Sequence, residues 1–239
     1  MSFEPGLLLG KTAVVTGGAQ GIGAAIANAL AGLGATVTAA DLGDGDGTLD
    51  PAVRLHRTDV TSDSSVQALL DGLPQLDTVV NCAGIIRRGA EHDIAVFEQV
   101  LAVNLAGTMR VCSAARSRLQ ASRGCIVNMA SMLSFFGGAL VPGYAASKGG
   151  VAQLTKSLAI AYAPDGIRVN AVAPGWIATP LTQPLQNDPA RAGPILARTP
   201  LGRWGTPQDV ALAVVFLCAP AAAFVTGVVL PVDGGYLVA

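Results

Sequence analysis

The sequence predicts an α/β fold, a single-domain doubly wound parallel sheet with helices on both faces. Short β-branched runs alternate along the chain with Ala/Leu-rich stretches, as strands alternate with helices in parallel βαβ units. The predicted strands are apolar at successive positions, which indicates that both of their faces are buried. No linker or repeat divides the 239 residues, of which 51% are hydrophobic. We therefore expect one domain, residues 1–239.

The elements follow in order from residue type. Short runs rich in Val, Ile and Thr predict strands, and longer stretches in which Ala and Leu recur predict helices. In the first half of the chain these are strand 12–16, helix 22–33, strand 36–40, strand 53–57, helix 64–73 and strand 77–80. In the second half they are helix 96–119, strand 125–129, helix 144–162, strand 168–172, helix 207–218 and strand 228–232.

One connection is too short for a helix. Between Asp41 and Val53 the chain is rich in Gly and Asp, and its length does not accommodate strand ends plus a full helix. We predict a loop crossover there. The alternating Asp and Gly residues also suggest a calcium loop, but the distal Glu of an EF-hand loop is absent, which favours solvent-exposed turns.

The composition excludes several kinds of partner. A net charge of -1 and the lack of any Lys/Arg run argue against nucleic acid and anionic membranes. The first residues lack the pattern of a signal peptide, and no segment has roughly 18 uninterrupted apolar residues, so we expect a cytoplasmic protein. The thiols are far apart, without any CxxC, and histidines are few, so we expect reduced cysteines and no metal site. These residues are Cys82, Cys112, Cys125, Cys218, His56 and His92.

A glycine-rich turn stands directly between the first strand and the first helix. Its sequence is Thr16-Gly17-Gly-Ala-Gln-Gly21-Ile-Gly23. Glycines let the backbone approach a pyrophosphate closely, and the free N–H groups of the helix N-terminus attract its negative charge. A simple tight connection is the alternative, but the position between strand and helix favours dinucleotide binding.

Two acidic residues follow the second and third strands. Asp41 stands 18 residues after Gly23, where a carboxylate can accept hydrogen bonds from the adenosine ribose hydroxyls. Asp41 would repel a 2′-phosphate, and neither Gln20 nor Leu42 supplies a positive charge, so NAD is favoured over NADP. Asp41 could instead be a turn residue. Asp59 could accept from the adenine amino group or could cap the next helix, and both interpretations remain open.

Tyr144 and Lys148 lie four residues apart at the start of a predicted helix, so both side chains project from one face. A free phenol has a pKa of about 10 and is a poor base near neutrality. An ammonium nearby favours the phenolate, so we expect Lys148 to lower the pKa of Tyr144. The pair predicts a general base beside its activator, although the same spacing also occurs by chance on amphipathic helices.

Together these motifs resemble the short-chain dehydrogenase/reductase family from end to end. Asn81-Cys82-Ala83-Gly84 is similar to the family's Asn-Asn-Ala-Gly element, with Cys in place of the second Asn. The resemblance implies a Rossmann-like fold, a homotetramer, a lid at about 178–205 and a catalytic tetrad of Asn104, Ser131, Tyr144 and Lys148. It also implies that NAD or NADH is bound by Gly17, Gln20, Gly21, Ile22, Gly23, Asp41, Asp59, Val60, Asn81, Ala83, Gly84, Tyr144, Lys148, Pro174, Gly175, Ile177 and Thr179. A plain connecting loop remains the alternative to the lid.

The tetrad has a chemical rationale. Removal of hydride from a carbinol carbon requires the hydroxyl proton to leave, and Tyr144 as phenolate would take it while Ser131 holds the oxygen. The resemblance implies that Lys148 also binds the nicotinamide ribose and that Asn104 holds a water that relays protons. Individually, each of these residues could instead be structural: Ser131 as a turn cap, Asn104 bonded to backbone, and Lys148 solvated.

Two adjacent basic residues bear on the substrate. Arg87 and Arg88 follow Gly84-Ile-Ile at the end of the fourth strand, and a guanidinium can bind a carboxylate bidentately. They could also form a solvated basic turn or an intersubunit ion pair. Gly84-Ile-Ile-Arg-Arg88 resembles the branch of the family that oxidises deoxy and keto-deoxy sugar acids. With Ser131 and Tyr144, these arginines are the predicted substrate contacts.

Three functions from different classes remain open. The first is an NAD-dependent dehydrogenase of an anionic sugar acid, and the second is a broader carbonyl reductase of the 3-oxoacyl or secondary-alcohol type. The third is a nucleotide-binding regulator without turnover. A complete tetrad argues against the third, because a pure binding module needs neither a base nor an activator.

Overall fold

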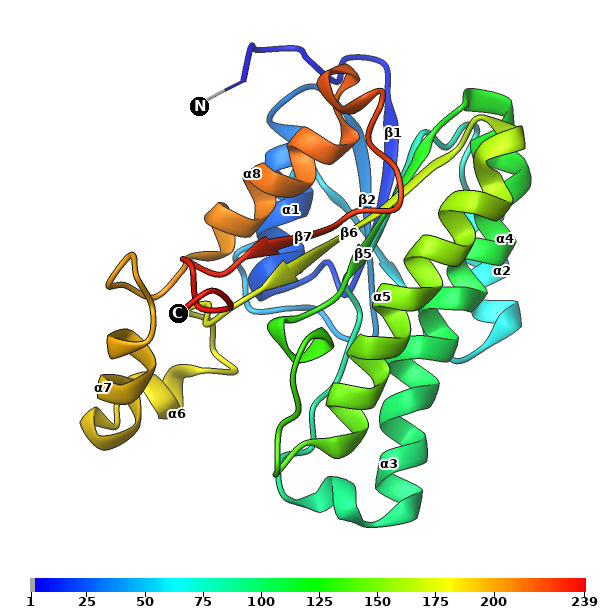
Figure 1. The fold of residues 1–239 in the computed structure, drawn as a ribbon. Coiled ribbons are helices and arrows are strands. Elements are labelled where there is room, and N and C mark those ends of the chain that lie inside the picture. Colours follow the sequence, from blue (N-terminus) through cyan, green and yellow to red (C-terminus); the bar gives the residue numbers. More distant parts are fainter. Residues whose placement is uncertain (1–2) are drawn as a thin grey trace.

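A seven-stranded parallel sheet lies between two layers of helices in the computed structural model, which describes residues 3–239 (Figure 1). The strand order is β3-β2-β1-β4-β5-β6-β7, and every neighbouring pair is parallel. The predicted doubly wound fold is confirmed. The strands are β1 Thr12–Thr16, β2 Thr36–Asp41, β3 Arg54–Arg57, β4 Thr78–Asn81, β5 Cys125–Met129, β6 Arg168–Pro174 and β7 Val229–Val232. The helices are α1 Gly21–Ala31, α2 Asp63–Asp71, α3 Ile94–Leu101, α4 Gly107–Ser122, α5 Pro142–Tyr162, α6 Gln183–Gln186, α7 Pro189–Ala197 and α8 Pro207–Cys218.

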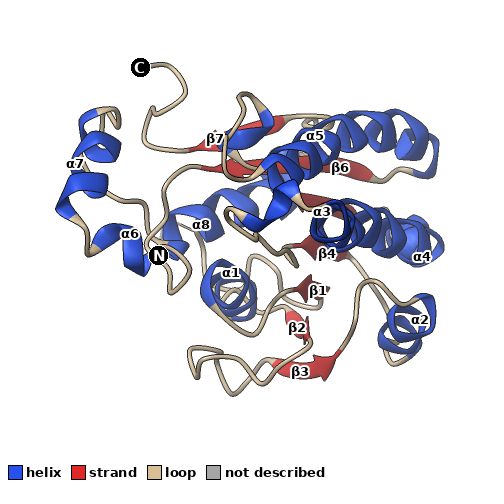
Figure 2. Ribbon diagram, turned by 90° about the horizontal axis from the view of Figure 1, so that it is seen from below, coloured by secondary structure: helices blue, strands red, loops and turns tan. Residues whose placement is uncertain are grey.

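The helices divide between the two faces of the sheet. Figure 2 shows α1 and α8 on one side and α2, α4 and α5 on the other. Ile26 and Leu30 of α1 share a buried cluster with Val210 and Val214 of α8. All residues of β1, β4 and β5 are buried, as the continuous apolar runs predicted. The central strands are therefore held in place by packing on both faces, and their carboxyl ends lie at the same edge of the sheet.

The crossover from β2 to β3 contains no helix, as predicted from its Gly and Asp content. Asn28 on α1 holds the loop through two hydrogen bonds: its Nδ2 donates to the Thr48 carbonyl at 2.8 Å, and its Oδ1 accepts from the Asp50 amide at 2.8 Å. Val53 and Leu49 from the loop pack against the α1 side of the core. The loop thereby substitutes for a covering helix.

The predicted helix 96–119 is not uniform. It begins at Ile94 as α3, passes through a π-helical turn at Ala102–Ala106 and continues as α4. By length and composition Ile94–Ser122 is apolar enough to cross a membrane. In this fold it instead packs its apolar face on the sheet, and its basic residues pair with neighbouring acids. The ion pairs are Arg110–Asp63, Arg116–Asp165 and Arg118–Asp71.

The segment predicted as a lid contains two short helices that the sequence did not reveal, α6 and α7. Figure 1 shows them beside the C-terminus, on the opposite side of the molecule from α4. The Leu201 amide donates to the Gly234 carbonyl at 3.1 Å. This bond joins the end of the segment to the C-terminal tail, and residues 178–205 remain a predicted lid.

Candidate active site

A cleft of about 540 Å³ opens at the carboxyl edge of the sheet. Because parallel strands end together, the turns after β1, β2, β3 and β4 and the first turns of α5 meet there. Its volume lies within the range of small-molecule sites. The predicted site residues that line it are Gly17, Gln20, Gly21, Ile22, Gly23, Asp41, Asp59, Val60, Ala83, Gly84, Arg87, Tyr144, Lys148 and Thr179.

The glycine turn fits a diphosphate. A Cβ atom on Gly23 would lie 1.9 Å from the Gly17 carbonyl oxygen, and one on Gly17 would lie 2.7 Å from Ala83 Cα. At Gly21 a Cβ would approach only Thr179, at 3.9 Å, so the backbone faces open space. Helix α1 begins at Gly21 without a side-chain cap or an acidic first turn. Its first N–H groups therefore lack a side-chain cap and can bind an anion, and the Asp46 carboxylate interacts with one of them, the Gly21 amide.

Asp41 and Asp59 line the adenosine end predicted for the cleft. Asp41 Oδ2 accepts from the Ala19 amide at 3.1 Å and its Oδ1 accepts from the Leu42 amide at 2.8 Å. Asp59 Oδ1 accepts from the amide and hydroxyl of Thr61, which lowers the pKa of Asp59. The cap of α2 is Ser62, so the prediction that Asp59 could cap this helix is wrong.

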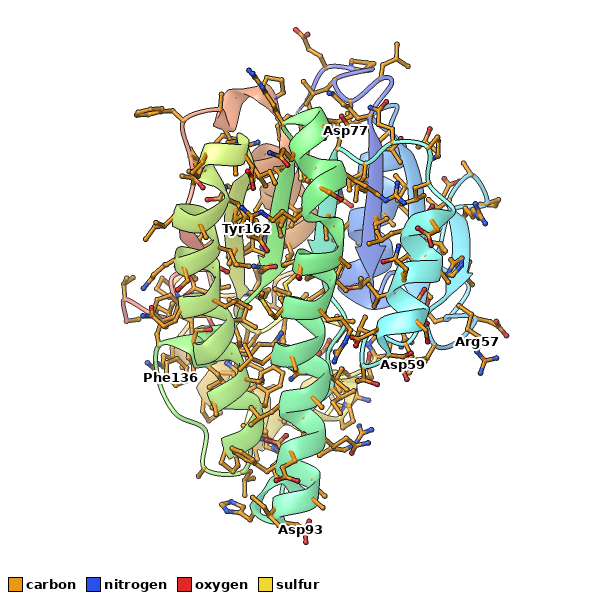
Figure 3. All side chains as sticks on the ribbon, turned by 90° about the vertical axis from the view of Figure 1, so that its right-hand side faces the viewer. Arg57, Asp59, Asp77, Asp93, Phe136 and Tyr162 are labelled. Atoms are coloured by element: carbon orange, nitrogen blue, oxygen red, sulfur yellow. The ribbon has the colours of Figure 1, made fainter. Side chains whose placement is uncertain are left out.

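The sequence did not single out the basic residue that pairs with Asp41 across the sheet. In the parallel pairing of β2 with β3, Arg57 stands opposite Asp41 in register. Figure 3 shows the Arg57 side chain extending outward from the edge of the sheet, near Asp59. Strand pairing alone brings this residue close, so the spacing along the sequence gave no signal for it.

Tyr144 and Lys148 lie together as predicted, but their electrostatics differ from the expectation. Lys148 is 3% exposed, its Nζ donates to the Met129 carbonyl at 2.6 Å, and burial lowers its pKa to about 8. Nζ lies 5.5 Å from the centroid of the Tyr144 ring. Burial raises the pKa of Tyr144 to about 12, and the hydrogen bond with Ser131 only partly opposes this rise. The pKa of Tyr144 is therefore raised and not lowered as expected, because desolvation of the phenolate dominates and Lys148 does not offset it.

Ser131 stands at the end of β5 and begins a short 3-10 turn, Met132–Ser134. Its Oγ accepts from the Leu133 amide at 3.1 Å, so Ser131 does cap a turn. The Ser134 hydroxyl accepts from the Ser131 amide at 3.2 Å and donates to the Lys148 carbonyl at 2.7 Å. Ser134, which the sequence did not single out, thereby joins this turn to α5 and holds Ser131 beside Tyr144.

Asn104 lies in the π-helical turn and is 1% exposed. Its Oδ1 accepts from the Ile85 amide at 2.8 Å, and its Nδ2 donates to the Ile85 carbonyl at 2.9 Å and to Ser147 Oγ at 3.1 Å. The side chain therefore connects the turn after β4 to α5. π-helical turns often occur at functional sites.

Several predicted residues lie outside the cleft lining. Asn81 is buried in the sheet, where its Nδ2 donates to Asn128 Oδ1 at 2.9 Å and to Cys112 Sγ at 3.2 Å. Asn81 supports the sheet because its side chain points between β4 and β5 instead of past the strand end. The other predicted residues outside the lining are Arg88, Asn104, Ser131, Pro174, Gly175 and Ile177. Cleft residues that the sequence did not single out are Ala40, Leu42, Thr58, Cys82, Ile85, Ile86, Val103, Met129, Pro180 and Leu181.

The two predicted substrate arginines differ in position. Arg87 lines the cleft together with Tyr144 and Lys148, whereas Arg88 does not. Both side chains are exposed, and within residues 3–239 neither forms an ion pair. The Arg87 guanidinium is therefore available to an anion in the cleft.

Known proteins are similar to this chain in sequence and in fold. A family model described as enoyl-(acyl carrier protein) reductase matches residues 17–237. The chain is 42% identical to 2-dehydro-3-deoxy-D-gluconate 5-dehydrogenase of Bacillus subtilis over 96% of each protein. It is 44% identical to cis-4-hydroxycyclohexanecarboxylate dehydrogenase of Sinomonas cyclohexanicum, over 95% of this chain and 96% of that protein.

A solved structure is equally similar. The crystal structure of a candidate 2-deoxy-D-gluconate 3-dehydrogenase from Agrobacterium tumefaciens, with bound NADP, shares 42% identity and a TM-score of 0.91. The match covers 99% of this chain and 100% of that one. Sequence motifs, strand order and these relatives agree, and the chain belongs to the short-chain dehydrogenase/reductase family.

Proposed function

We propose that this protein is an NAD-dependent dehydrogenase that interconverts a secondary alcohol and a ketone on a small carboxylic acid, deoxy and keto-deoxy sugar acids included. Oxidoreduction at CH–OH groups is the activity named for its relatives. The single observation that carries the acid preference is Arg87, an exposed residue on the wall of the cleft that contains Tyr144 and Lys148. Within residues 3–239 its guanidinium forms no ion pair and donates to the Ile86 carbonyl at 3.4 Å. Arginine binds carboxylates bidentately and so selects acids over neutral alcohols.

The names of two relatives narrow the substrate class. In 2-dehydro-3-deoxy-D-gluconate oxidised at carbon 5, and in cis-4-hydroxycyclohexanecarboxylate, the carbinol carbon stands four bonds from the carboxylate carbon. One molecule is an open chain and the other is a ring, so this separation is a feature that they share. We therefore infer that the preferred substrates are δ-hydroxy carboxylates, whose carboxylate reaches Arg87 when the hydroxyl is at Tyr144.

Two residues that line the cleft, Tyr144 and Lys148, and two that lie behind the lining, Ser131 and Asn104, have distinct roles in the proposed reaction. Tyr144 takes the proton from the substrate hydroxyl, and Ser131, hydrogen-bonded to Tyr144, holds the substrate oxygen. Lys148 supplies positive charge behind the tyrosine, and Asn104 keeps the turn after β4 against α5. Bound nicotinamide supplies the hydride acceptor. In ketone reduction Tyr144 returns the proton.

Asp41 supports the preference for NAD, because its carboxylate would repel a 2′-phosphate. Arg57 and the NADP bound to the Agrobacterium tumefaciens structure support the alternative, NADP. Dissociation constants for both cofactors in Asp41→Ala and Arg57→Ala distinguish the two. We expect Asp41→Ala to weaken NAD and to strengthen NADP, and Arg57→Ala to leave NAD unchanged. An unchanged preference in Asp41→Ala would exclude the ribose assignment.

A turnover screen tests the substrate class. The panel contains 5-hydroxy and 3-hydroxy carboxylates, the matching carboxamides, and simple secondary alcohols, each offered with NAD and with NADP. We expect the highest kcat/KM for a 5-hydroxy carboxylate and a large loss for its carboxamide. Efficient oxidation of simple secondary alcohols without preference for acids would favour the broader carbonyl reductase. Tight cofactor binding without any turnover would favour a regulator.

We further propose a cytoplasmic homotetramer, as the family resemblance implies. Ala145, Ala146 and Gly149 on α5 allow close approach of a second copy, whereas Gly150 packs against Leu105 of the same chain. Burial of exposed apolar side chains such as Ile160 between subunits would also stabilise such an assembly. Light scattering of the purified protein measures the assembly state, and a monomer would contradict the proposal.

A further inference from the structure

A buried carboxylate outside the predicted tetrad contacts two site residues at once. Glu91 is 1% exposed and lies in the short turn between β4 and α3. Its Oε1 accepts from the Arg87 amide at 2.7 Å, and its Oε2 accepts from the Tyr144 amide at 2.7 Å. In residues 3–239 no basic side chain pairs with it. Burial of a carboxylate costs desolvation free energy, which hydrogen bonds to the charged group offset. The two hydrogen bonds from the Arg87 and Tyr144 amides are therefore strong and fix both amides against Glu91.

Helix α5 explains why a distant carboxylate is required. Val141 at its N-cap has no side-chain acceptor, Pro142 follows, and the first turn contains no acidic residue. The Tyr144 amide would be left without a partner at the positive end of the helix dipole. Glu91 supplies from another segment the acceptor that the helix lacks, and does so at the proposed catalytic residue.

The surrounding backbone is built to admit this carboxylate. A Cβ on Gly143 would lie 3.3 Å from Glu91 Oε2 and 3.2 Å from Phe97 Cδ2, so glycine leaves room for the contact. Two further bonds join the same segments: the Gly89 amide donates to the Leu140 carbonyl at 2.7 Å, and His92 Nε2 lies 2.9 Å from the Ala139 carbonyl oxygen. The turn after β4 and the start of α5 thus form one unit.

We propose that Glu91 is a positioning residue that fixes the distance between Arg87, the proposed carboxylate contact, and Tyr144, the proposed proton acceptor. The Arg87 part of this inference rests on the proposed function. A fixed distance between these groups would match substrates by the separation of hydroxyl and carboxylate. Glu91 therefore acts on specificity through backbone amides, without touching the substrate itself.

The charge of Glu91 gives a second, independent signature. The ionisable groups around Tyr144 are Cys82 after β4, Lys148 on α5 and Glu91, with Arg87 on the same cleft and His92 beside Glu91. Burial is the main cause of the raised pKa of Tyr144, and the negative charge of Glu91 adds to it. Removal of that charge should therefore move the pH dependence of alcohol oxidation towards acid.

Glu91→Gln tests both signatures, because glutamine presents one acceptor and one N–H group to the two amides. We expect the KM for a hydroxy carboxylate to rise roughly tenfold or more, with a smaller change for a neutral secondary alcohol. We also expect the rising limb of log kcat/KM against pH to move to lower pH. The control is Asp93→Asn, two residues away, which removes a carboxylate that caps α3 (Figure 3). It should show neither effect.

The proposal would be overturned if KM changed equally for acid and neutral substrates and the rising limb of log kcat/KM against pH did not move. Glu91 would then have only a general structural role. Should Glu91→Gln fail to fold, Gly143→Ala decides, because its methyl group crowds the carboxylate without removing charge. It should raise the KM for the acid and leave the pH limb in place, and an unchanged KM would overturn the proposal.

The proposed function can fail separately. A wild-type enzyme without preference for acids would contradict it, but the shift of the pH limb in Glu91→Gln can still be measured with any alcohol oxidised. Tyrosinate absorbance during pH titration, with Tyr144→Phe as the blank, reports the same shift without turnover. An unshifted tyrosinate titration would overturn the electrostatic part.

Discussion

Lys148 Nζ lies 2.6 Å from the carbonyl oxygen of Met129, the last residue of β5, and so connects α5 to the carboxyl end of that strand. This bond directs the ammonium at the sheet and leaves it 5.5 Å from the Tyr144 ring centroid. Lys148 therefore connects two elements of the fold and also places a positive charge near Tyr144. Its substitution should change both the stability of the fold and the rate of catalysis.

Tyr144→Phe should remove most turnover, by about 100-fold or more, because general acid–base catalysis typically contributes that much. The phenyl ring keeps the packing, so cofactor affinity and thermal stability should change little. Steady-state rates and a cofactor titration on the same preparation check this. Turnover near that of the wild type would exclude Tyr144 as the base.

Lys148→Met should change how stability depends on pH. Burial lowers the pKa of Lys148 to about 8, below its ordinary value of 10.5, so between these values the unfolded chain binds the extra proton. The unfolding free energy contributed by this lysine therefore rises with pH across that window, by about 1.4 kcal/mol per pH unit. Denaturant unfolding at several pH values, wild type minus Lys148→Met, should reveal this rise. A flat difference would contradict the buried charge.

Arg87→Ala should raise the KM for a hydroxy carboxylate by roughly tenfold or more, since charge-assisted hydrogen bonds contribute about 1.5–3 kcal/mol. The KM for a neutral alcohol should stay near the wild-type value. Arg88→Ala is the matched control, because its side chain lies outside the cleft. Parallel losses in both variants would indicate a general effect of surface charge.

Gly23→Ala should destabilise the glycine turn, because the new Cβ would lie 1.9 Å from the Gly17 carbonyl oxygen and the backbone must move. We expect a loss of about 1–3 kcal/mol in the free energy of unfolding and a marked loss of cofactor affinity. The control is Gly193→Ala on α7, where a Cβ meets no atom within 4 Å. That variant should be neutral or slightly stabilising.

The sequence predicted the sheet, its order of elements and the meeting of Tyr144 with Lys148, because these depend on local periodicity and on where parallel strands end. The absence of a helix between Asp41 and Val53 was predictable from the Gly and Asp content and the short length of that segment. The π-helical turn around Asn104 was not, since the contacts of Asn104 with Ile85 and Ser147 form only in the folded chain.

Other features depend on tertiary packing and left no local signal. Burial decides the pKa of Tyr144, and a spacing of four residues cannot report burial. Glu91 was not singled out because it is a lone acid whose partner on α5, the Tyr144 amide, is distant in sequence. Its one available signal was a helix that begins at Val141 and Pro142 without an acceptor. Prolines within α6 and α7 interrupt the helical sequence pattern, so these two helices were not predicted.

The crossover without a helix, between β2 and β3, makes the two ends of the cleft unequal in local stability. Strand β3 is at the sheet edge, its Arg54, Leu55 and Arg57 are exposed, and a loop covers its neighbour. Amide hydrogen exchange should therefore be fastest there among the strands, while β5 stays protected. Because β3 leads into Asp59 and Val60 on the cleft wall, cofactor binding should slow that exchange. The reacting end of the substrate would then lie beside the well-protected strand β5. Cofactor binding would mainly stabilise β3, the strand that opens most easily.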